Sequence, residues 1–134
     1  MNDPIGQRTL EVMAHAKYYN FWLYNIIKPW LKKNMAEVGA GVGNFLGFFL
    51  KDGFEVTAID LNPVYLRKII ESHPGVKTFQ FDLESPSIPT SLLSRFDTVV
   101  SLNVLEHVPN ISQAIKNIHS ILKALRLFHP NVVY

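Results

Sequence analysis

Three glycines at alternate positions follow a short apolar run that carries one acidic residue. The run covers residues 34–38 and contains Glu37, and the glycines are Gly39, Gly41 and Gly43. Glycine lets the backbone turn sharply and lets a ligand approach where a Cβ would stand in the way. The first N–H groups of a helix have no partner inside that helix and face whatever binds there. Since an apolar segment follows at residues 44–51, we predict a strand, a tight turn and a helix start around a ligand.

The rest of the chain alternates between apolar runs and helical patterns. We expect strands at residues 34–38, 54–59, 76–81 and 96–102, and helices at residues 44–51, 62–72 and 111–125. Residues 7–31 are also expected to be helical, in two segments, with Pro29 ending or kinking the second. Strands that alternate with helices are typical of a parallel sheet with right-handed crossovers. We therefore predict an α/β fold, with an open parallel sheet, helices on both of its faces and an N-terminal helical cap.

The composition limits the class of protein and its partners. With 134 residues, 48% of them hydrophobic, the chain is expected to form one domain with a substantial core. A formal net charge of +2 without a basic stripe gives no reason to expect a nucleic-acid partner. The sequence has no cysteine, which excludes disulfides and thiolate metal sites. No apolar stretch is long enough for a membrane span, and we expect a cytoplasmic protein.

Each predicted strand ends in or next to a polar residue. In chain order these are Glu37, Asp60, Asp82 and Asn103. Ligands of open α/β sheets bind beyond the carboxyl ends of the strands, where the strand order reverses. We therefore expect the four side chains to surround one ligand site.

Two motifs resemble those of a known family. The Glu-x-Gly-x-Gly-x-Gly pattern from Glu37 to Gly43 resembles motif I of class I S-adenosylmethionine (SAM) dependent methyltransferases. It fits the dinucleotide fingerprint Gly-x-Gly-x-x-Gly less well, because the last position of that pattern falls on Asn44. The segment from Phe96 to Val108 resembles the FDxVxxxxVLEHV segment of small-molecule methyltransferases, which include quinone-biosynthesis O-methyltransferases. The resemblance implies the strand order 3-2-1-4, SAM as cofactor and methyl transfer to an O, N or C atom of a small molecule.

The resemblance also assigns roles to residues at the strand ends. Asp60 is the acid expected to bind the ribose hydroxyls, although a carboxylate there could instead cap a helix, for which Asn62 is also available. Leu61 is expected to pack on the adenine. Asp82 is expected to bind the adenine amino group, or else to be a solvated loop acid, and the N–H of Leu83 is expected to bond a ring nitrogen.

The methionine end of the cofactor is expected to meet the first and fourth strands. Glu37 is expected to bind the ammonium group, and Asn103 lies in the loop that holds this end in the family. The full set of cofactor-binding residues that we predict is Glu37, Gly39, Ala40, Gly41, Gly43, Asp60, Leu61, Asp82, Leu83 and Asn103. We expect no metal site, because Glu106 and His107 alone make a weak ligand set.

Two further assignments leave alternatives open. His107 is either a general base for a substrate hydroxyl or a structural residue of its loop. The aromatic run at residues 18–22 is either the core-facing side of a helix or a lid over the cofactor, a place that helices before motif I often take in the family.

The end of the chain departs from the family pattern. Members of the family continue with a glycine-containing turn and further strands, whereas residues 122–130 contain no glycine. We therefore expect a cap at residues 1–33, a core at 34–125, a tail at 126–134 and a sheet without its C-terminal strands. The fourth strand would then be an open edge. We expect a homodimer through this edge, and the alternative is that residues 131–134 fold back onto it. A SAM-binding module without turnover, or one that needs a partner chain, is the second hypothesis for function, and a NAD-binding domain is a weaker third.

Overall fold

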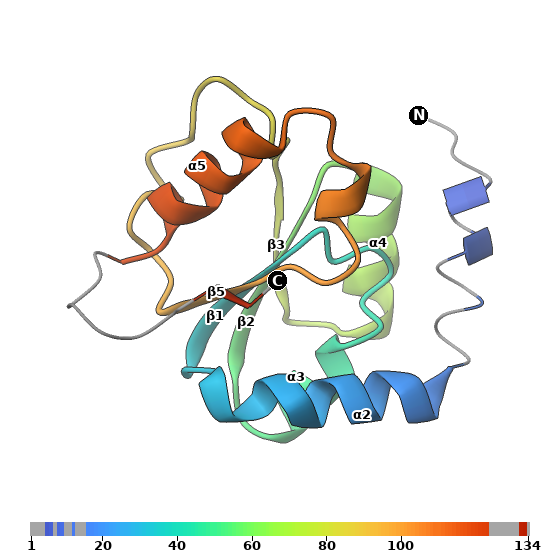
Figure 1. Cartoon of the computed structure of the whole chain (residues 1–134). Coiled ribbons are helices and arrows are strands. Elements are labelled where there is room, and N and C mark those ends of the chain that lie inside the picture. The colour runs from blue at the N-terminus through green and yellow to red at the C-terminus, as the bar shows by residue number, and fades with distance from the viewer. Residues whose placement is uncertain (1–4, 7, 10–11, 13–15, 124–131, 134) are drawn as a thin grey trace.

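The protein contains a five-stranded parallel sheet. The structure is a computed structural model of the chain, and it describes residues 5–6, 8–9, 12, 16–123 and 132–133. The strand order is β3-β2-β1-β4-β5, and every pair of neighbouring strands is parallel (Figure 1). The strands are β1 (Asn34–Val38), β2 (Glu55–Asp60), β3 (Lys77–Gln80), β4 (Thr98–Val100) and β5 (Val132–Val133). The predicted Rossmann-like sheet with the order 3-2-1-4 is confirmed.

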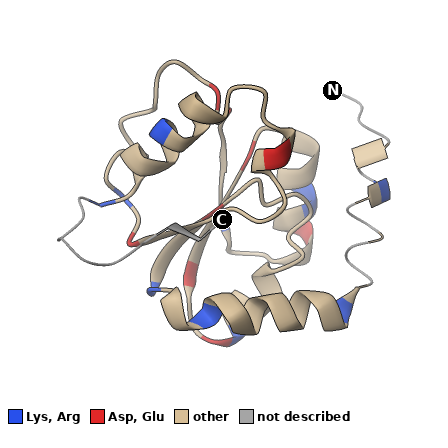
Figure 2. Ribbon diagram, in the orientation of Figure 1, with Lys and Arg blue, Asp and Glu red and all other residues tan. Residues whose placement is uncertain are grey.

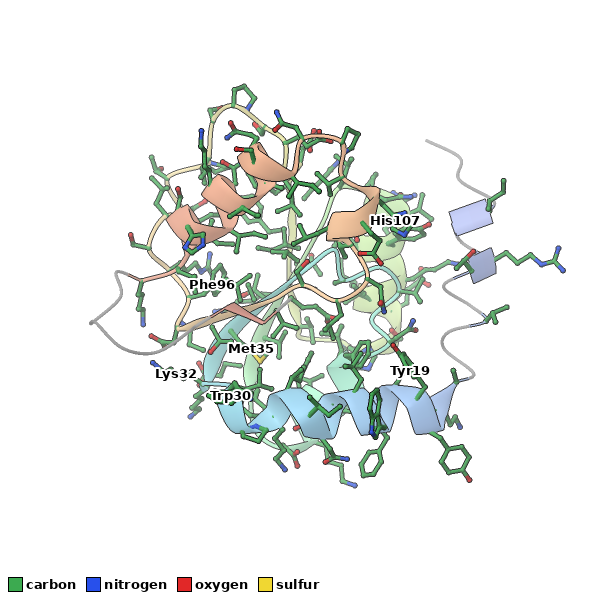
Figure 3. All side chains as sticks on the ribbon, in the orientation of Figure 1. Tyr19, Trp30, Lys32, Met35, Phe96 and His107 are labelled. Carbon is green, nitrogen blue, oxygen red and sulfur yellow. The ribbon has the colours of Figure 1, made fainter. Side chains whose placement is uncertain are left out.

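Helices cover both faces of this sheet. The helices are α2 (Lys17–Ile27), α3 (Leu46–Lys51), α4 (Pro63–Ser72) and α5 (Ile111–Ile121), with 3-10 turns η1 (Lys28–Trp30) and η2 (Leu105–His107). Residues 5–6, 8–9 and 12 are also helical. One buried cluster joins α2, α3 and α4 to one face of the sheet, and a second joins α5 to the other face. Figure 3 labels Met35 from the first cluster and Phe96 from the second.

The local sequence explains where these helices begin and end. Asn62 caps α4, since its side-chain oxygen accepts a hydrogen bond from the N–H of Val64 at 2.9 Å, and Pro63 takes the first helical position, where its missing N–H costs nothing. Asn110 caps α5 in the same way through the N–H of Gln113. α2 ends at Ile27, and Pro29 lies in the 3-10 turn that follows.

α5 and β4 are the two elements that fall furthest short of the lengths that the sequence pattern predicted. α5 ends at Ile121, and Leu122 is extended and forms an isolated parallel bridge with Phe96. The N–H of Lys123 donates to the carbonyl oxygen of Phe96 at 2.8 Å, so this bridge replaces the last helical turn that we expected. β4 likewise covers only Thr98–Val100 of the predicted strand at residues 96–102. Residues 124 and 125 of the predicted helix lie outside the described residues.

The outer edge of β4 is occupied, contrary to the open edge that we expected. β5 pairs with it in parallel, with Val132 beside Val99 and Val133 beside Val100. A fifth strand is therefore present, and Val132 and Val133 lie along this edge, as in the fold-back alternative. Within the described part of the chain, no helix is long and apolar enough to cross a membrane.

Candidate functional site

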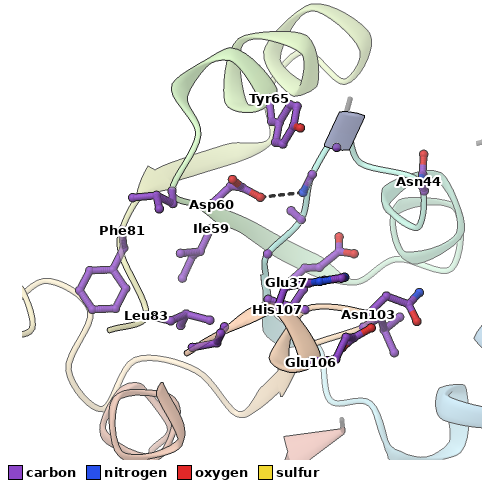
Figure 4. A pocket seen from close by; sticks show the side chains of 18 of the residues that line it. Glu37, Asn44, Ile59, Asp60, Tyr65, Phe81, Leu83, Asn103, Glu106 and His107 are labelled. Atoms are coloured by element: carbon purple, nitrogen blue, oxygen red, sulfur yellow. Dashed lines mark hydrogen bonds between the residues drawn. The ribbon is translucent and has the colours of Figure 1, made fainter. Parts of the chain in front are cut away.

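A cavity of about 780 Å³ opens at the carboxyl ends of β1, β2 and β4 (Figure 4). On one side of β1 the sheet continues with β2 and then β3, and on the other side it continues with β4 and then β5. The cavity therefore lies at the point where the strand order reverses, which is where ligands bind in open α/β sheets.

Nearly all of the predicted residues contribute to this cavity. Its lining includes Glu37, Gly39, Ala40, Gly41, Asp60, Leu61, Asp82, Leu83, Asn103 and His107. Gly43 does not line the cavity. Its φ is +83°, and a Cβ there would lie 2.8 Å from Leu46 Cδ1 and 3.2 Å from Ile69 Cγ1. The close approach of the turn to α3 and α4 is what requires a glycine at this position.

Glu37 stands at the end of β1 with its carboxyl group buried. The residue is 3% exposed, and within the described structure its Oε2 atom has no hydrogen-bond partner. Burial, followed by the nearby charge of Asp60, raises the pKa of Glu37 to about 8. A buried carboxyl oxygen without a partner costs free energy in the free protein, so the site suits a ligand that brings a donor, above all a cationic one.

The glycine turn is anchored to the end of β2. The N–H groups of Gly39 and Ala40 both donate to the carbonyl oxygen of Ile59, at 2.8 and 3.1 Å. Gly39 has a φ of +69°, and a Cβ at this position would lie 2.2 Å from Val104 Cγ2. The turn thus fits directly beneath the loop that follows β4, and this fit brings two walls of the cavity together.

Asp60 holds the glycine turn in addition to facing the cavity. Its Oδ2 accepts a hydrogen bond from the N–H of Gly41 and its Oδ1 accepts one from the N–H of Asn62, both at 2.8 Å. Burial raises the pKa of Asp60, and these backbone hydrogen bonds act in the opposite direction. Each carboxylate oxygen keeps a second lone pair with which it can accept a ligand hydroxyl. The helix α4 is capped by Asn62, so Asp60 does not have the capping role that we considered as an alternative.

Asp82 and Leu83 lie on a segment that is fastened to α5. The side-chain amide of Asn117 donates to the carbonyl oxygens of Leu83 at 2.7 Å and Ser85 at 2.8 Å. The N–H of Asn110 donates to Glu84 Oε1 at 2.8 Å. Asn117 is buried, and its hydrogen bonds hold this segment in place at the wall of the cavity. The sequence pattern did not single out Asn117, because an amide on the inner face of an amphipathic helix breaks the apolar stripe.

The loop after β4 supplies the opposite wall. Asn103 has a φ of +58°, which is uncommon for a residue other than glycine, and both it and His107 are exposed at the cavity. Glu106 is exposed beside His107. Among the described residues no group of three or more His, Cys, Asp or Glu side chains is placed to hold a metal ion.

Several lining residues were not predicted to belong to the site. The apolar ones beside the predicted acids and glycines include Phe45, Ile59, Phe81 and Val104. Ile5, Gly6 and Thr9 reach the cavity from the N-terminal region, whereas no residue of the aromatic run 18–22 lines it. Neither alternative for that run describes the structure: it does not line the cavity as a lid would, and its four aromatic side chains are exposed rather than core-facing.

Comparison with known proteins agrees with this architecture. A family model described as a methyltransferase domain matches residues 36–124. Ubiquinone biosynthesis O-methyltransferases of Azotobacter vinelandii and Pseudomonas syringae pv. tomato are 29% and 28% identical to this chain over 93 residues. That stretch is 68% of this chain and 40% of each relative, so the chain spans well under two thirds of the length of the curated relatives that it matches.

Solved structures of methyltransferases share the fold. An S-adenosylmethionine dependent methyltransferase from Mesorhizobium loti superposes with a TM-score of 0.62 at 20% identity, over 75% of this chain and 48% of that protein. The trans-methyltransferase CalH, solved as a complex with SAH, superposes with a TM-score of 0.54 at 20% identity, over 67% of this chain and 29% of that protein. The family match covers more than half of the chain, and it includes the glycine turn and the strand ends around the cavity. The chain therefore belongs to the methyltransferase domain family, in the Rossmann-like fold of the SAM-dependent methyltransferases.

Proposed function

We propose that this chain binds SAM in the cavity and takes part in methyl transfer to a small molecule. The observation that carries the proposal is the buried carboxyl group of Glu37, whose Oε2 atom has no partner among the described residues. An amino-acid ammonium group supplies the donor and the positive charge that this oxygen lacks. When bound, SAM supplies a methyl group on a sulfonium, which a nucleophile displaces.

The remaining predicted residues bind different parts of the cofactor. Asp60, already anchored by two backbone N–H groups, accepts the ribose hydroxyls, and Leu61 covers one face of the adenine. Asp82 and the N–H of Leu83 bind the adenine edge on the segment that Asn117 holds. The glycine turn lets the cofactor approach the backbone, and Asn103 closes the methionine end.

His107 is the residue that we assign to the substrate side of the cavity. It is exposed in the 3-10 turn η2, where its imidazole can accept a proton from a substrate hydroxyl. Methyl transfer can also proceed by positioning alone, because an in-line displacement gains much of its rate from a fixed geometry. The loss of His107 is therefore expected to lower turnover without lowering SAM affinity.

The substrate is expected to be a small molecule rather than a nucleic acid. The curated relatives carry the name ubiquinone biosynthesis O-methyltransferase, which makes a hydroxyl group our first choice of methyl acceptor. Because this chain spans 40% of those relatives, the second candidate function is SAM binding by a module that a further segment or chain completes. Binding without turnover distinguishes that candidate. The cytoplasmic location stays a prediction.

Calorimetry with SAM and with NAD tests the cofactor assignment, and Asp60→Ala sharpens it. We expect SAM but not NAD to bind, and we expect the variant to bind SAM roughly ten- to hundredfold more weakly, because it loses a charge-assisted contact of about 1.5–3 kcal/mol. Asp97→Ala is the matched control, since Asp97 pairs with Lys123 at 3.0 Å and does not line the cavity. Equal affinity of both variants for SAM would contradict the assignment of Asp60 to the cofactor.

The occupied β4 edge changes the oligomeric state that we propose. Because Val132 and Val133 pair with that edge, we expect a monomer in which the amides of Val99 and Val100 exchange slowly with solvent. Sedimentation at several concentrations, together with hydrogen exchange, measures both properties. A dimer whose formation slows exchange at Thr98 to Val100 would instead support the homodimer that the sequence predicted.

A further inference from the structure

α2 presents a face of large aromatic side chains that are about half exposed or more, and of these Phe21 also contacts the ring of Phe48 on α3, with ring centroids 6.0 Å apart. The helix buries Asn20, Tyr24 and Ile27 against the sheet layer. Its outer side is 93% exposed at Tyr18, 58% at Trp22 and 48% at Ile26. We call the exposed set the aromatic face; its members are Tyr18, Tyr19, Phe21, Trp22, Ile26 and, in η1, Trp30.

Such a face is unusual for a helix on the surface of a protein. A helix that covers a core normally turns charged and polar side chains outward, and one that is apolar all round is normally buried. Contiguous exposed apolar surface marks a place where something docks. None of the members lines the cavity, so the aromatic face is separate from the candidate cofactor site.

The charges around the aromatic face have one dominant sign. Residues 17–36 contain four lysines and no acidic residue. Lys28 pairs with Asp52 at 2.9 Å and Lys33 pairs with Glu55 at 3.3 Å. Lys17 and Lys32 have no acidic partner among the described residues, so the surface keeps a net positive charge. Figure 2 shows basic residues along α2 and the turn that follows it, and Figure 3 labels Trp30 and Lys32 in that region.

This combination of side chains and charge selects the kind of partner. Two copies meeting face to face would bring the lysines of both chains together, because a twofold interface sets each patch against itself. Tyrosine and tryptophan are enriched where proteins meet the headgroup region of a bilayer, since each ring has an apolar body and a polar group. Lysines beside them are attracted by anionic lipids. We propose that the aromatic face docks this chain on the surface of an anionic membrane.

The two tryptophans of the chain give a direct test, because Trp22 and Trp30 both belong to the aromatic face. Vesicles of phosphatidylcholine with phosphatidylglycerol are expected to shift the tryptophan emission to shorter wavelength and to sediment the protein. Vesicles of phosphatidylcholine alone are expected to do so at least tenfold more weakly, and added salt is expected to weaken the response to anionic vesicles. Brominated lipids should quench the tryptophan emission if the aromatic face enters the headgroup region. This experiment uses the wild-type protein, so its result does not depend on whether a variant folds.

Matched variants separate the aromatic and the charge contributions. Tyr18→Ser combined with Trp22→Ser should weaken vesicle binding at least tenfold, whereas Ile70→Ser, at a residue 50% exposed on α4, should leave it unchanged. Lys32→Gln should weaken binding about fivefold, whereas Lys77→Gln on β3 should have no effect. Wild-type emission that anionic vesicles neither shift nor quench overturns the proposal. So does a concentration-dependent dimer whose emission is already shifted without vesicles, because the face would then belong to a second copy. SAM is absent from these experiments, so their outcome is independent of the proposed cofactor.

Discussion

Replacing Gly39 by alanine is expected to abolish measurable SAM binding and to destabilise the fold. The new Cβ would lie 2.2 Å from Val104 Cγ2 and 2.7 Å from Val104 Cγ1, closer than any stable contact. Relief requires the turn or the loop after β4 to move, and both are walls of the cavity. The left-handed φ of +69° adds strain for a residue with a Cβ. We expect SAM affinity to fall more than a hundredfold and the free energy of unfolding to fall by about 2–4 kcal/mol.

Gly53→Ala separates the steric effect from the backbone effect. Gly53 has a φ of +84°, and a Cβ built there meets no atom within 4 Å. The control should therefore lose only the cost of the left-handed conformation, about 1–2 kcal/mol, and should bind SAM normally. Chemical denaturation and calorimetry measure the two quantities. If Gly39→Ala loses no more stability or affinity than this control, the glycine is a turn residue without a role in the cavity.

A second substitution in the contacting residue should partly reverse the effect. Val104→Ala removes the two methyl groups nearest the new Cβ and leaves Val104 Cβ, 3.0 Å away. The double variant should therefore be more stable than Gly39→Ala, by an amount that a double-mutant cycle reports as coupling between the two residues.

The affinity for SAM is expected to rise with pH through the titration of Glu37. Its pKa of about 8 means that the carboxyl group of the free protein holds a proton at pH 6. An ammonium ligand favours the ionised carboxylate, so binding must release this proton, and affinity should increase by up to about tenfold for each pH unit between pH 6 and pH 7.5. Calorimetry in buffers of different ionisation enthalpy measures the proton release directly. Wild-type binding that is independent of pH and releases no proton would contradict the role of Glu37.

Glu37→Gln should weaken SAM binding and at the same time stabilise the free protein at pH 8. The variant lacks the charge, so we expect SAM affinity to fall roughly ten- to hundredfold at pH 7.5 and its pH dependence to flatten. The free protein should nevertheless become more stable than the wild type at pH 8. Between the model-peptide pKa of 4.5 and the native pKa of about 8, native Glu37 keeps a proton that the unfolded chain has released. The free energy of unfolding of the wild type therefore falls as pH rises through this window, by about 3–5 kcal/mol in total, and the variant avoids this loss. Equal stability of the two proteins at pH 8 would show that the carboxyl group is better solvated than the structure indicates.

The sequence predicted the acidic residues of the site better than the lengths of the helices and strands. Glu37, Asp60 and Asp82 were recognisable because an acidic residue in or after an apolar strand has few structural explanations, and all three line the cavity. Leu122 continues the apolar stripe of α5, so periodicity placed it in the helix. Its actual extended conformation depends on hydrogen bonds to Phe96, which lies in a different part of the chain.

The features that the sequence did not predict depend on tertiary contacts. Ile5 and Thr9 line the cavity although they lie far along the chain from most of its other lining residues, and no local sequence pattern predicts such a contact. Gly43 shares the spacing of the cavity glycines, yet it packs against α3 and α4, a difference that only the positions of Leu46 and Ile69 reveal. The fold-back of β5 could not be chosen from a four-residue tail, because both the open edge and the paired edge satisfy the same β-prone sequence.

The uniformly parallel sheet also governs the order in which the site can form. No two neighbouring strands of a parallel sheet can be joined by a tight turn, so every pairing waits for a crossover to be completed. The central pair aligns Met35 with Thr98, which come from opposite halves of the chain. Pairings between such distant segments are slow, because the intervening loop must be ordered first. During synthesis, the turn at Gly39 leaves the ribosome long before Val104, the residue that must lie above it. The two walls of the cavity at Gly39 and Val104 can therefore come together only after the fourth strand and its loop have been synthesised.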